Sequence, residues 1–264
     1  MKSEEFATAM RKRIVVKIGS NVLTRKDGKL DVTRMSALVD QVAWLRKEGH
    51  EVILVSSGAV ACGRRELKVS HELDSVEQRP LYSALGQVKL IGLYYDLFRV
   101  FNIHVGQVLT MKENFEPGEQ YSNQRACMTV MLENGVLPIV NENDTVSVTE
   151  LMFTDNDELS GLIAQMMKAD TLILLSNIDG IYDGNPDDPK SQLIRQVEPN
   201  RDLSEYIQPE KSAFGRGGMH SKYTTATKVQ QAGIRVIIAN GERENILVDL
   251  IEDKNNTPHT EFMV

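Results

Sequence analysis

Two lysines from opposite ends of the chain are the residues best suited to chemistry. Lys17 lies near the end of a strand-like run, Arg13–Ile18, and precedes Gly19, where backbone amides lie open to a ligand. Lys222 follows a glycine-rich segment, residues 215–218, that leads into an expected helix. Exposed amides, a helix N-terminus and cations favour phosphate. If both lysines face one crevice, they would flank a transferring phosphoryl group, whose chemistry depends mostly on positioning and charge stabilisation.

Each of these features also has a purely structural interpretation. Lys17 could belong to an edge strand and extend its ammonium group to water. Glycines before a helix are often only a flexible turn. The glycine-rich segment is no P-loop, because GxxxxGK[ST] does not occur in the chain, and no GxGxxG follows the first strand. The segment therefore has to be interpreted together with its neighbours in space.

Acidic and amide residues form two further clusters. Asp155 and Asp157 lie two residues apart at an expected helix start. They could hold the lysines in place or help bind Mg²⁺, or they could simply cap the helix. Asn141, Asn143 and Asp144 follow an expected strand. Amides suit a carboxylate and Asp144 suits an ammonium group, so this loop fits a small zwitterion, although Asn and Asp are also common turn residues.

Strand-like and helix-like segments alternate along the chain. The expected strands are 13–18, 51–55, 103–109, 136–140, 171–175 and 234–238, with a weak one near 194–197 and a terminal one at 259–264. The expected helices are 31–48, 80–99, 120–133, 159–168, one that starts at 219, and 245–251. Pro138 favours a short or edge-like strand. The alternation predicts one α/β domain over residues 1–264, a three-layer α/β/α sandwich with a mainly parallel central sheet.

Five polar clusters follow these strands or precede a helix. They are residues 17–21, 56–60, 141–145, 176–182 and the glycine-rich segment before 219. In open α/β sheets, ligands bind in the crevice outside the carboxyl ends of the strands. We therefore expect the clusters to converge on one crevice. Tyr182, in the fourth cluster, could stack on a base or pack on the surface.

The composition excludes several classes of protein. Hydrophobic residues make up 41% of the 264 residues, enough to fill a core. A net charge of −7 argues against a nucleic-acid-binding protein. Cys62 and Cys127 have no CxxC spacing, which indicates reduced thiols in a cytoplasmic protein, and the five histidines lack metal-ligand spacing. No run reaches membrane-spanning length, and residues 1–12 lack the apolar centre of a signal peptide.

A series of short motifs occurs in an order typical of a known family. They are Lys17-Ile-Gly-Ser-Asn, Ser56-Ser-Gly-Ala, Ser83-Ala-Leu-Gly-Gln, Val140-Asn-Glu-Asn-Asp144, Asp155-Asn-Asp, Gly180-Ile-Tyr and Gly215-x-Gly-Gly-Met219-x-x-Lys222. From about residue 12 to 250 the chain resembles the amino acid kinase superfamily. Within it, the Asn-Glu-Asn-Asp loop and the Leu-Gly-Gln helix are most similar to the glutamate 5-kinase (γ-glutamyl kinase) family. They differ from the N-acetylglutamate, aspartate, carbamate and uridylate kinases.

The resemblance implies a phosphotransferase that uses ATP and Mg²⁺ to phosphorylate the γ-carboxylate of L-glutamate. The product would be L-glutamyl 5-phosphate, in the first step of proline biosynthesis. The N-terminal part would bind glutamate, through Ser57, Asp144 and Asn156, and the C-terminal part would bind ATP. The catalytic residues would be Lys17 and Lys222, which stabilise the phosphoryl group, and Asp155, which organises them. The implied ATP site comprises Lys17, Ser176, Asn177, Arg216, Gly217, Gly218, Met219, His220, Ser221 and Lys222.

A carboxylate nucleophile is already ionised at pH 7, so this reaction needs no general base. The lack of a candidate catalytic histidine is therefore no objection. The resemblance also implies a homo-oligomer, dimer or tetramer, and a glutamyl-phosphate reductase as a plausible partner that takes the labile product. No nucleic acid or membrane partner is expected.

Three departures from the family pattern leave alternatives open. Arg216 stands where the family usually has Thr, and Ser176-Asn177 stands where it often has Thr-Asp. The chain stops at Val264, so we expect no C-terminal PUA domain of RNA-binding type. One alternative is a kinase for another small carboxylate, aspartate or N-acetylglutamate. Another, suggested by Arg216 and Asn177, is a catalytically silent nucleotide-binding regulator.

Overall fold

A single mixed sheet forms the centre of the protein in the computed structural model, which describes residues 11–67, 74–146, 153–207, 218–254 and 256–264. Its strand order is β3-β4-β2-β1-β5-β7-β8-β6. The strands are β1 Arg13–Ile18, β2 Glu51–Ser56, β3 Val105–Thr110, β4 Leu137–Glu142, β5 Thr171–Ser176, β6 Gln196–Val197, β7 Arg235–Asn240 and β8 His259–Phe262. Neighbours pair in parallel except β7 and β8, which are antiparallel.

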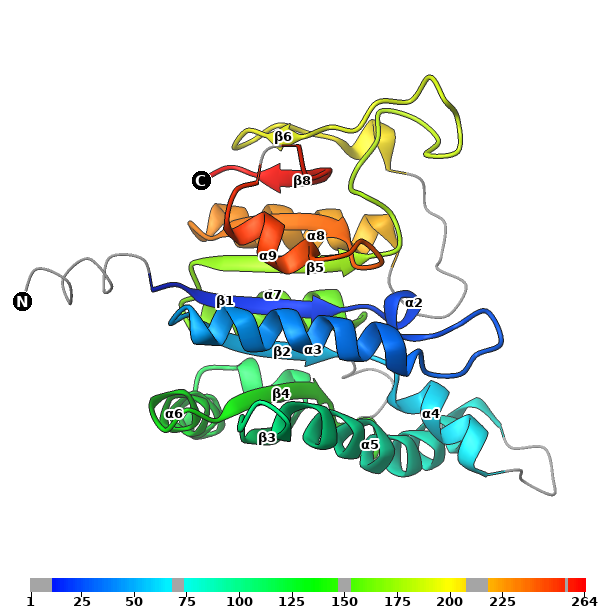
Figure 1. Cartoon of the computed structure of the whole chain (residues 1–264), viewed down its shortest axis with the longest axis vertical. Helices are drawn as coiled ribbons and strands as arrows, with labels where there is room; N and C mark the ends of the chain where they lie inside the picture. Colours follow the sequence, from blue (N-terminus) through cyan, green and yellow to red (C-terminus); the bar gives the residue numbers. More distant parts are fainter. Residues whose placement is uncertain (1–10, 68–73, 147–152, 208–217, 255) are drawn as a thin grey trace, which may run out of the picture.

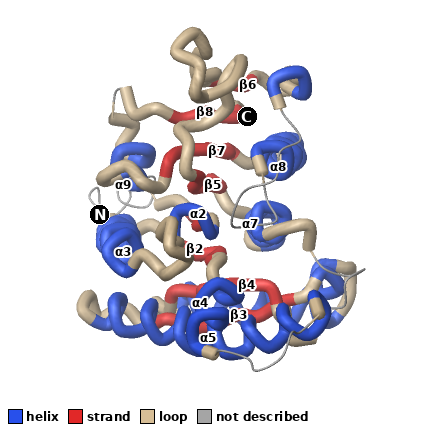
Figure 2. Tube along the Cα trace, turned by 90° about the vertical axis from the view of Figure 1, so that its right-hand side faces the viewer, coloured by secondary structure: helices blue, strands red, loops and turns tan. Residues whose placement is uncertain are grey.

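Helices cover both faces of the sheet, as Figures 1 and 2 show from two directions. Within the described residues the α-helices are α2 Ser20–Leu23, α3 Val32–Lys47, α4 Ala59–Glu66, α5 Ser75–Arg99, α6 Glu119–Glu133, α7 Asn156–Met166, α8 Met219–Gln231 and α9 Ile246–Ile251, and the 3₁₀ turns are η1 Lys112–Phe115 and η3 Ser204–Tyr206. Side chains of α2, α3, α5 and α9 enter one apolar cluster, and those of α6, α7 and α8 enter the other. The predicted three-layer α/β/α sandwich with a mainly parallel sheet is confirmed.

Strand β1 lies in the middle of the sheet and is buried on both faces. Ile14, Val16 and Ile18 enter the cluster on the α3 side, whereas Val15 enters the cluster on the α7 and α8 side. Side chains alternate between the two faces of a strand. Lys17 therefore points to the same face as Val15, toward the layer formed by α7 and α8.

Helices α4 and α5 approach each other unusually closely, through two glycines. A Cβ atom on Gly86 would lie 1.7 Å from the carbonyl oxygen of Ala59, and one on Gly63 would lie 1.8 Å from that of Tyr82. Any side chain at either position would separate the helices. The glycine of the Leu-Gly-Gln motif therefore has a packing role, which fixes α5 beside the carboxyl end of β2.

Two expectations about elements were wrong. Pro138 favoured a short or edge-like strand, yet β4 spans Leu137–Glu142 and lies between β3 and β2. The backbone amide of Leu137 donates a hydrogen bond to the carbonyl oxygen of His104, next to β3. Successive residues of a strand face alternate neighbours, so Pro138, which has no amide hydrogen, faces β2. The pairing of β4 with β2 begins only at the next residue, Ile139. Helix α5 was expected from Pro80 but begins at Ser75, because Asp74 and Glu77 form a capping box.

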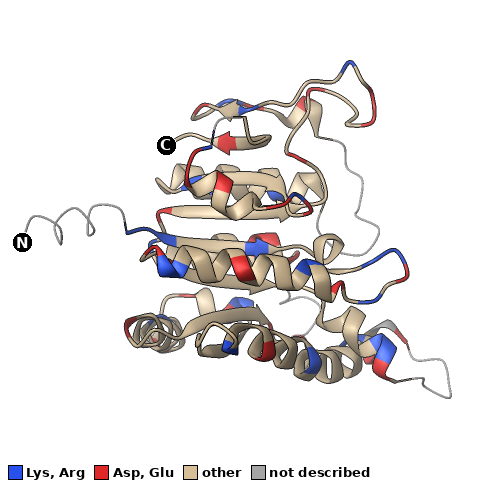
Figure 3. Ribbon diagram, viewed as in Figure 1, with Lys and Arg blue, Asp and Glu red and all other residues tan. Residues whose placement is uncertain are grey.

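Charged residues are mixed over the helices and loops in the view of Figure 3, without a face of one sign. No helix of the described residues is long and apolar enough to cross a membrane. Both cysteines are free thiols, as expected, and burial raises the pKa of Cys62 to about 11. Cys62 is thus a packing residue rather than a nucleophile.

Candidate active site

A cavity of about 780 Å³ lies at the carboxyl ends of β1, β2, β4 and β5. Residues from each strand-end cluster line it, together with Gly218 and Met219 at the start of α8. The predicted convergence of the polar clusters is therefore confirmed for the described residues. Arg216 and Gly217, both expected at the ATP site, lie outside the described residues.

The two lysines meet on one carboxylate, that of Asp157 in the first turn of α7. The Nζ atom of Lys17 lies 2.7 Å from Asp157 Oδ1, and Nζ of Lys222 lies 3.1 Å from Oδ2. The exposed fractions are 5% for Lys17, 7% for Lys222 and 0% for Asp157. The structure thus brings together residues far apart in the sequence as a buried Lys–Asp–Lys triad with a net charge of +1.

Burial and charge act in opposite directions within this triad. Burial pushes the pKa of Asp157 upward, but the ammonium groups of Lys17 and Lys222 outweigh it and hold that pKa below its usual range. Burial also lowers the pKa of Lys17, and Lys222 adds to this effect, while Asp157 opposes it. Counted alone, the triad has one more ammonium group than carboxylates, so its two ammonium groups can attract an anion, while the charge of Asp155 also acts on Lys17.

Asp155 and Asp157 divide the two roles considered for them. Asp155 caps α7, since its Oδ1 accepts hydrogen bonds from the amides of Asp157, at 2.8 Å, and Glu158, at 3.1 Å. The direct partner of both lysines is Asp157 and not Asp155, which lines the cavity. The second oxygen of Asp155, Oδ2, is buried and has no hydrogen-bond partner among the described residues.

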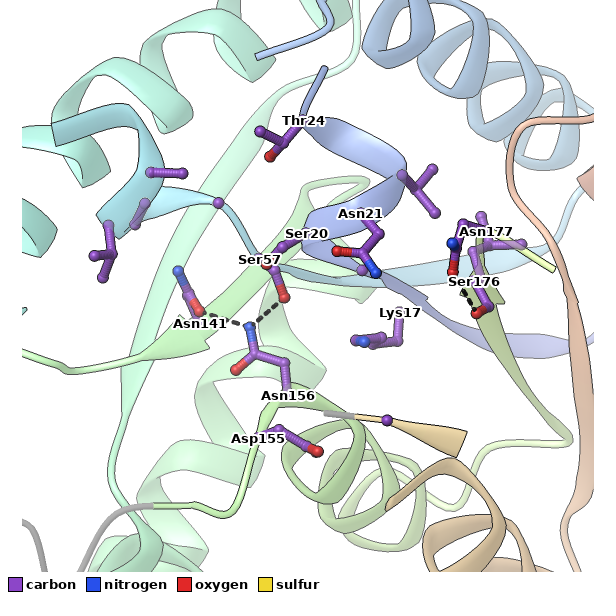
Figure 4. Close-up of a pocket in the computed structure, with 18 of the residues that line it drawn as sticks. Lys17, Ser20, Asn21, Thr24, Ser57, Asn141, Asp155, Asn156, Ser176 and Asn177 are labelled. Atoms are coloured by element: carbon purple, nitrogen blue, oxygen red, sulfur yellow. Dashed lines mark hydrogen bonds between the residues drawn. The ribbon is translucent and has the colours of Figure 1, made fainter. Parts of the chain in front are cut away.

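Amide side chains form the wall on the other side of Lys17 (Figure 4). The Nδ2 atom of Asn156 lies 3.1 Å from the carbonyl oxygen of Ser56, 3.0 Å from Ser57 Oγ and 3.0 Å from Asn141 Oδ1. Asn141 in turn donates from Nδ2 to Gln87 Oε1 at 3.0 Å. An amide nitrogen has two hydrogens for these three acceptors. Asn156 therefore leaves one acceptor available, and its own Oδ1 has no partner among the described residues.

Asp144 lies farther along the same wall, in a charged cluster. Its Oδ1 accepts a hydrogen bond from Arg79 Nε at 2.7 Å and also contacts Arg79 Nη2, while its Oδ2 accepts one from Ser83 Oγ at 3.1 Å. Arg79 Nη2 also donates to Glu142 Oε2 at 3.0 Å. Asp144 and Glu142 are buried, and Arg79 lines the cavity from α5.

The expected ATP-site residues are only partly brought to the cavity. Ser176, Asn177, Gly218 and Met219 line it with Lys17 and Lys222. His220 and Ser221 share the first turn of α8, but neither lines the cavity, and His220 is exposed.

Tyr182, whose role was left open, does not line the cavity. Its hydroxyl lies 3.5 Å from Asp179 Oδ2, and Arg243 pairs with both oxygens of Asp179 at 2.7 Å. Tyr182 therefore belongs to a polar cluster beside the cavity.

The sequence did not reveal Arg79 as a site residue. Its partners Glu142 and Asp144 lie 63 and 65 positions away, so no local pattern connects them. Gln87 was noted only as part of a motif. Asp157, in contrast, carried a signal: an N-cap residue uses its carboxylate on its own helix, which leaves the next acid for the lysines.

The arrangement has two chemically different ends. One end presents ammonium groups and the N-terminus of α8, which suit phosphate. The other presents open amide and carboxylate oxygens beside Ser57, which suit a small zwitterion. Among the described residues, no group of three or more His, Cys, Asp or Glu side chains could hold a metal ion by itself.

The sequence matches known proteins over almost its whole length. Residues 12–240 match the family model described as "Amino acid kinase family". The chain is 66% identical over 251 residues to "Glutamate 5-kinase" of Bacteroides thetaiotaomicron, which covers 95% of this chain and 70% of that protein. It is 47% identical to "Glutamate 5-kinase" of Chlorobaculum tepidum, over 89% of this chain and 65% of that protein. The chain thus spans about two thirds of the length of these relatives.

Solved structures of low sequence identity share the fold. The substrate complex of an isopentenyl phosphate kinase superposes with a TM-score of 0.68 at 16% identity, over 96% of this chain and 100% of that one. The UMP kinase of Ureaplasma parvum gives a TM-score of 0.64 at 18% identity, over 96% and 99%. At these identities the likeness concerns the architecture alone.

Proposed function

The chain belongs to the amino acid kinase family, and we propose that it transfers the γ-phosphoryl group of ATP to the γ-carboxylate of L-glutamate. The product is L-glutamyl 5-phosphate, and the reaction is the first step of proline biosynthesis. The relatives named above support the substrate, since both are glutamate 5-kinases. The observation that carries the proposal is the Lys17–Asp157–Lys222 triad in the same cavity as Ser57, Asp144 and Asn156.

The triad would act on the phosphoryl group. A carboxylate oxygen of glutamate forms a bond to the γ-phosphorus, and the bond from that phosphorus to the bridging oxygen breaks, so the electron pair leaves with ADP. Lys17 and Lys222 would stabilise the negative charge that this step spreads over the phosphoryl oxygens. Asp157 holds both ammonium groups in place beforehand. No residue has to remove a proton, because the attacking carboxylate is already ionised.

The opposite wall would bind the amino acid. Asp144 Oδ2 and Asn156 Oδ1 are acceptors for its α-ammonium group. Ser57, whose hydroxyl lies beside Asn156 Nδ2, would contribute a donor for a carboxylate. Ser176, Asn177 and the start of α8, with Gly218 and Met219, would form the nucleotide side of the cavity. We assign Arg216, Gly217, His220 and Ser221 to the nucleotide by resemblance alone.

A magnesium ion fits this site only with help from the nucleotide. Mg²⁺ in kinases is bound mainly by phosphate oxygens and water, with one or two protein carboxylates. Asp155 would supply such a group, because its buried Oδ2 has no partner in the part of the chain that the structure describes and its charge acts on Lys17. When bound, the ion would neutralise phosphate charge.

Three further features of the proposal come from the family resemblance. We assign the protein to the cytoplasm. We also expect it to form a homo-oligomer, either a dimer or a tetramer. An acyl phosphate is a labile product, so an enzyme that reduces it, a glutamyl-phosphate reductase, is the expected partner.

The test is a hydroxamate trap. The protein is incubated with Mg²⁺, ATP and hydroxylamine, and with glutamate, aspartate, N-acetylglutamate or no substrate. Acyl phosphate forms the hydroxamate only where a carboxylate has been phosphorylated. We expect signal with glutamate and little with the others. A larger kcat/KM for aspartate or N-acetylglutamate would change the substrate, and no signal at all despite ATP binding would contradict the proposal.

A further inference from the structure

Arg79, Glu142 and Asp144 form a charged cluster in the wall of the cavity that the phosphoryl-transfer chemistry does not use. Arg79 comes from the second turn of α5, whereas Glu142 ends β4 and Asp144 follows it. The exposed fraction of the Arg79 side chain is 27%, while those of Glu142 and Asp144 are 1% and 5%. Two buried carboxylates therefore share one guanidinium group that reaches the cavity.

The hydrogen bonds of this cluster fix the orientation of the Asp144 carboxylate. Arg79 Nε and Nη2 both contact Oδ1, and Ser83 Oγ donates to Oδ2 at 3.1 Å. Each carboxylate oxygen has two lone-pair directions. Oδ1 is therefore filled, whereas Oδ2 keeps one direction for a ligand. Because Asp144 lines the cavity, a hydrogen-bond donor of a ligand inside it can take that position.

Glu142 determines the charge of the cluster. A lone Arg79–Asp144 pair would be neutral and would attract a cation only weakly. The second carboxylate, at 3.0 Å from Arg79 Nη2, gives the cluster a net charge of −1. Glu142 is itself held by the amide of Phe153, which donates to Oε1 at 3.0 Å. Contacts with Arg79, Ser83 Oγ and the Phe153 amide thus hold the two carboxylates, and the three charged groups, counted together, match one ammonium group in charge.

We propose that Arg79 is a positioning residue for selecting an amino acid with a free α-ammonium group. Arg79 orients Asp144 toward that group, and Glu142 gives the cluster the net negative charge that favours an ammonium group over the same acid without one. The inference rests on the proposed function, since it concerns how the amino-acid end of that cavity chooses its ligand. Asp144 contacts the substrate, and Arg79 acts through Asp144.

The first test compares two ligands that differ in the amino group alone, L-glutamate and glutarate. Their dissociation constants are measured by calorimetry on the full chain and on Arg79→Gln. We expect the unchanged protein to bind glutamate at least about 10-fold more tightly than glutarate, as one charge-assisted hydrogen bond implies. In Arg79→Gln the cluster becomes more negative, but Asp144 loses the contacts that orient it. We expect this loss of orientation to dominate, so that glutamate binding weakens about 10-fold or more, glutarate binding changes less than about threefold, and selectivity collapses.

Three more variants make the result specific. Arg79→Lys supplies one point charge without the planar fork, so it should restore part of the selectivity. Glu142→Gln should weaken glutamate binding and leave glutarate binding equal or tighter, because it removes a negative charge. Lys89→Gln is the matched control, since Lys89 lies on the same helix but pairs with Glu66 at the surface, outside the cavity. It should leave both ligands unchanged.

Two outcomes would overturn the proposal. If both dissociation constants rise together in Arg79→Gln and the ratio is kept, the residue has only a structural role. If the unchanged protein does not distinguish the two ligands, the cluster does not select an ammonium group. A turnover assay distinguishes a failure of this proposal from a failure of the proposed function. A protein that makes no glutamyl hydroxamate refutes the proposed function, while the ratio of the dissociation constants for glutarate and glutamate still decides the role of Arg79. In an active enzyme, Arg79→Gln should raise the KM for glutamate and leave kcat within about threefold.

Discussion

The two ends of the cavity hold their polar groups by different means. At the phosphoryl end, three almost fully buried charges already form ion pairs between β1, α7 and α8 before a ligand binds. At the amino-acid end, amides and carboxylates leave individual oxygens open. Catalytic charges are most effective when they need no reorganisation during the reaction. Recognition, in contrast, needs acceptors that the ligand completes. The difference predicts that changes at the first end lower stability and turnover, and that changes at the second raise KM.

Asp157→Asn should have the largest effect. Removing this carboxylate leaves two buried ammonium groups without their common partner, and breaking such a buried pair costs about 3–5 kcal/mol of unfolding free energy. Chemical denaturation measures the loss. Asp96→Asn is the control, because Asp96 pairs with Arg99 on the exposed surface and should cost less than about 1 kcal/mol. Equal losses in both variants would contradict the central role of Asp157.

The contribution of Asp157 should also depend on pH in one direction. Its pKa in the folded protein lies below the ordinary value near 4, so its stabilisation is fully present above about pH 4. It is lost as the pH falls through the lowered folded value. The difference in unfolding free energy between the unchanged protein and Asp157→Asn should therefore keep its full value, about 3–5 kcal/mol, from pH 5 to 7. It should decrease below about pH 4. A difference that grows in acid would show that the carboxylate is not ionised in the fold.

Lys222→Met comes next. It removes one ammonium group but leaves Lys17 paired with Asp157, so the fold should persist while the net charge of the triad falls to zero. Losing such transition-state stabilisation costs about 3 kcal/mol or more, which is at least about a 100-fold decrease in kcat. Steady-state kinetics and circular dichroism together test this. Lys228→Met, an exposed lysine on the same helix, should retain full activity. Unchanged turnover in Lys222→Met would refute the role.

Asp144→Ala should act on binding. We expect the KM for glutamate to rise by about 10-fold or more, the effect of losing a charge-assisted hydrogen bond, with a smaller change in kcat. Asp144→Asn keeps the shape without the charge and should show most of the same increase. A decrease in kcat with unchanged KM would place Asp144 in the chemistry and would remove the contrast between the two ends.

Gln87→Ala should have the smallest effect. Gln87 acts through Asn141, which it orients by one buried hydrogen bond, so the expected cost is about 1 kcal/mol, or several-fold in the KM for glutamate. Gln230→Ala is the control, because Gln230 is also buried but bonds to the carbonyl oxygens of Val197 and Met263. It should lower the unfolding temperature without changing KM. If both variants change KM alike, the effect of Gln87 is general destabilisation.

Much of the site, with its two different ends, could be predicted from the sequence. Lys17 lies near the end of one β-rich run, and Ser57 and Asn141 follow two others. Because the carboxyl ends of parallel strands meet at one edge, their convergence was predictable. The start of α5 was also available, since Asp74 and Glu77 have capping-box spacing. The start was predicted wrongly because proline is common at the first position of a helix, which favoured Pro80.

Other features depend on tertiary structure alone. The position of β4 inside the sheet depends on which side of the strand lacks a donor at Pro138, and that requires knowing both neighbours. The choice of Asp157 over Asp155 depends on how α7 is rotated against β1. Arg79 meets carboxylates more than sixty positions away, and charge alone does not identify its partners among the other acids of the chain.

The alternation of side chains along β1 also limits how this chain can vary in length. If one residue were inserted or deleted in β1 before Lys17 and the strand pairing were kept, every side chain between the change and Gly19 would point to the opposite face of the sheet. The ammonium group would then enter the apolar layer of α3, and Ile18 or Val16 would face Asp157. Substitutions can be absorbed one at a time, whereas this shift disrupts two layers at once. We therefore expect related chains to place insertions and deletions in the loops around β1, and to keep the distance from Arg13 to Lys17 constant.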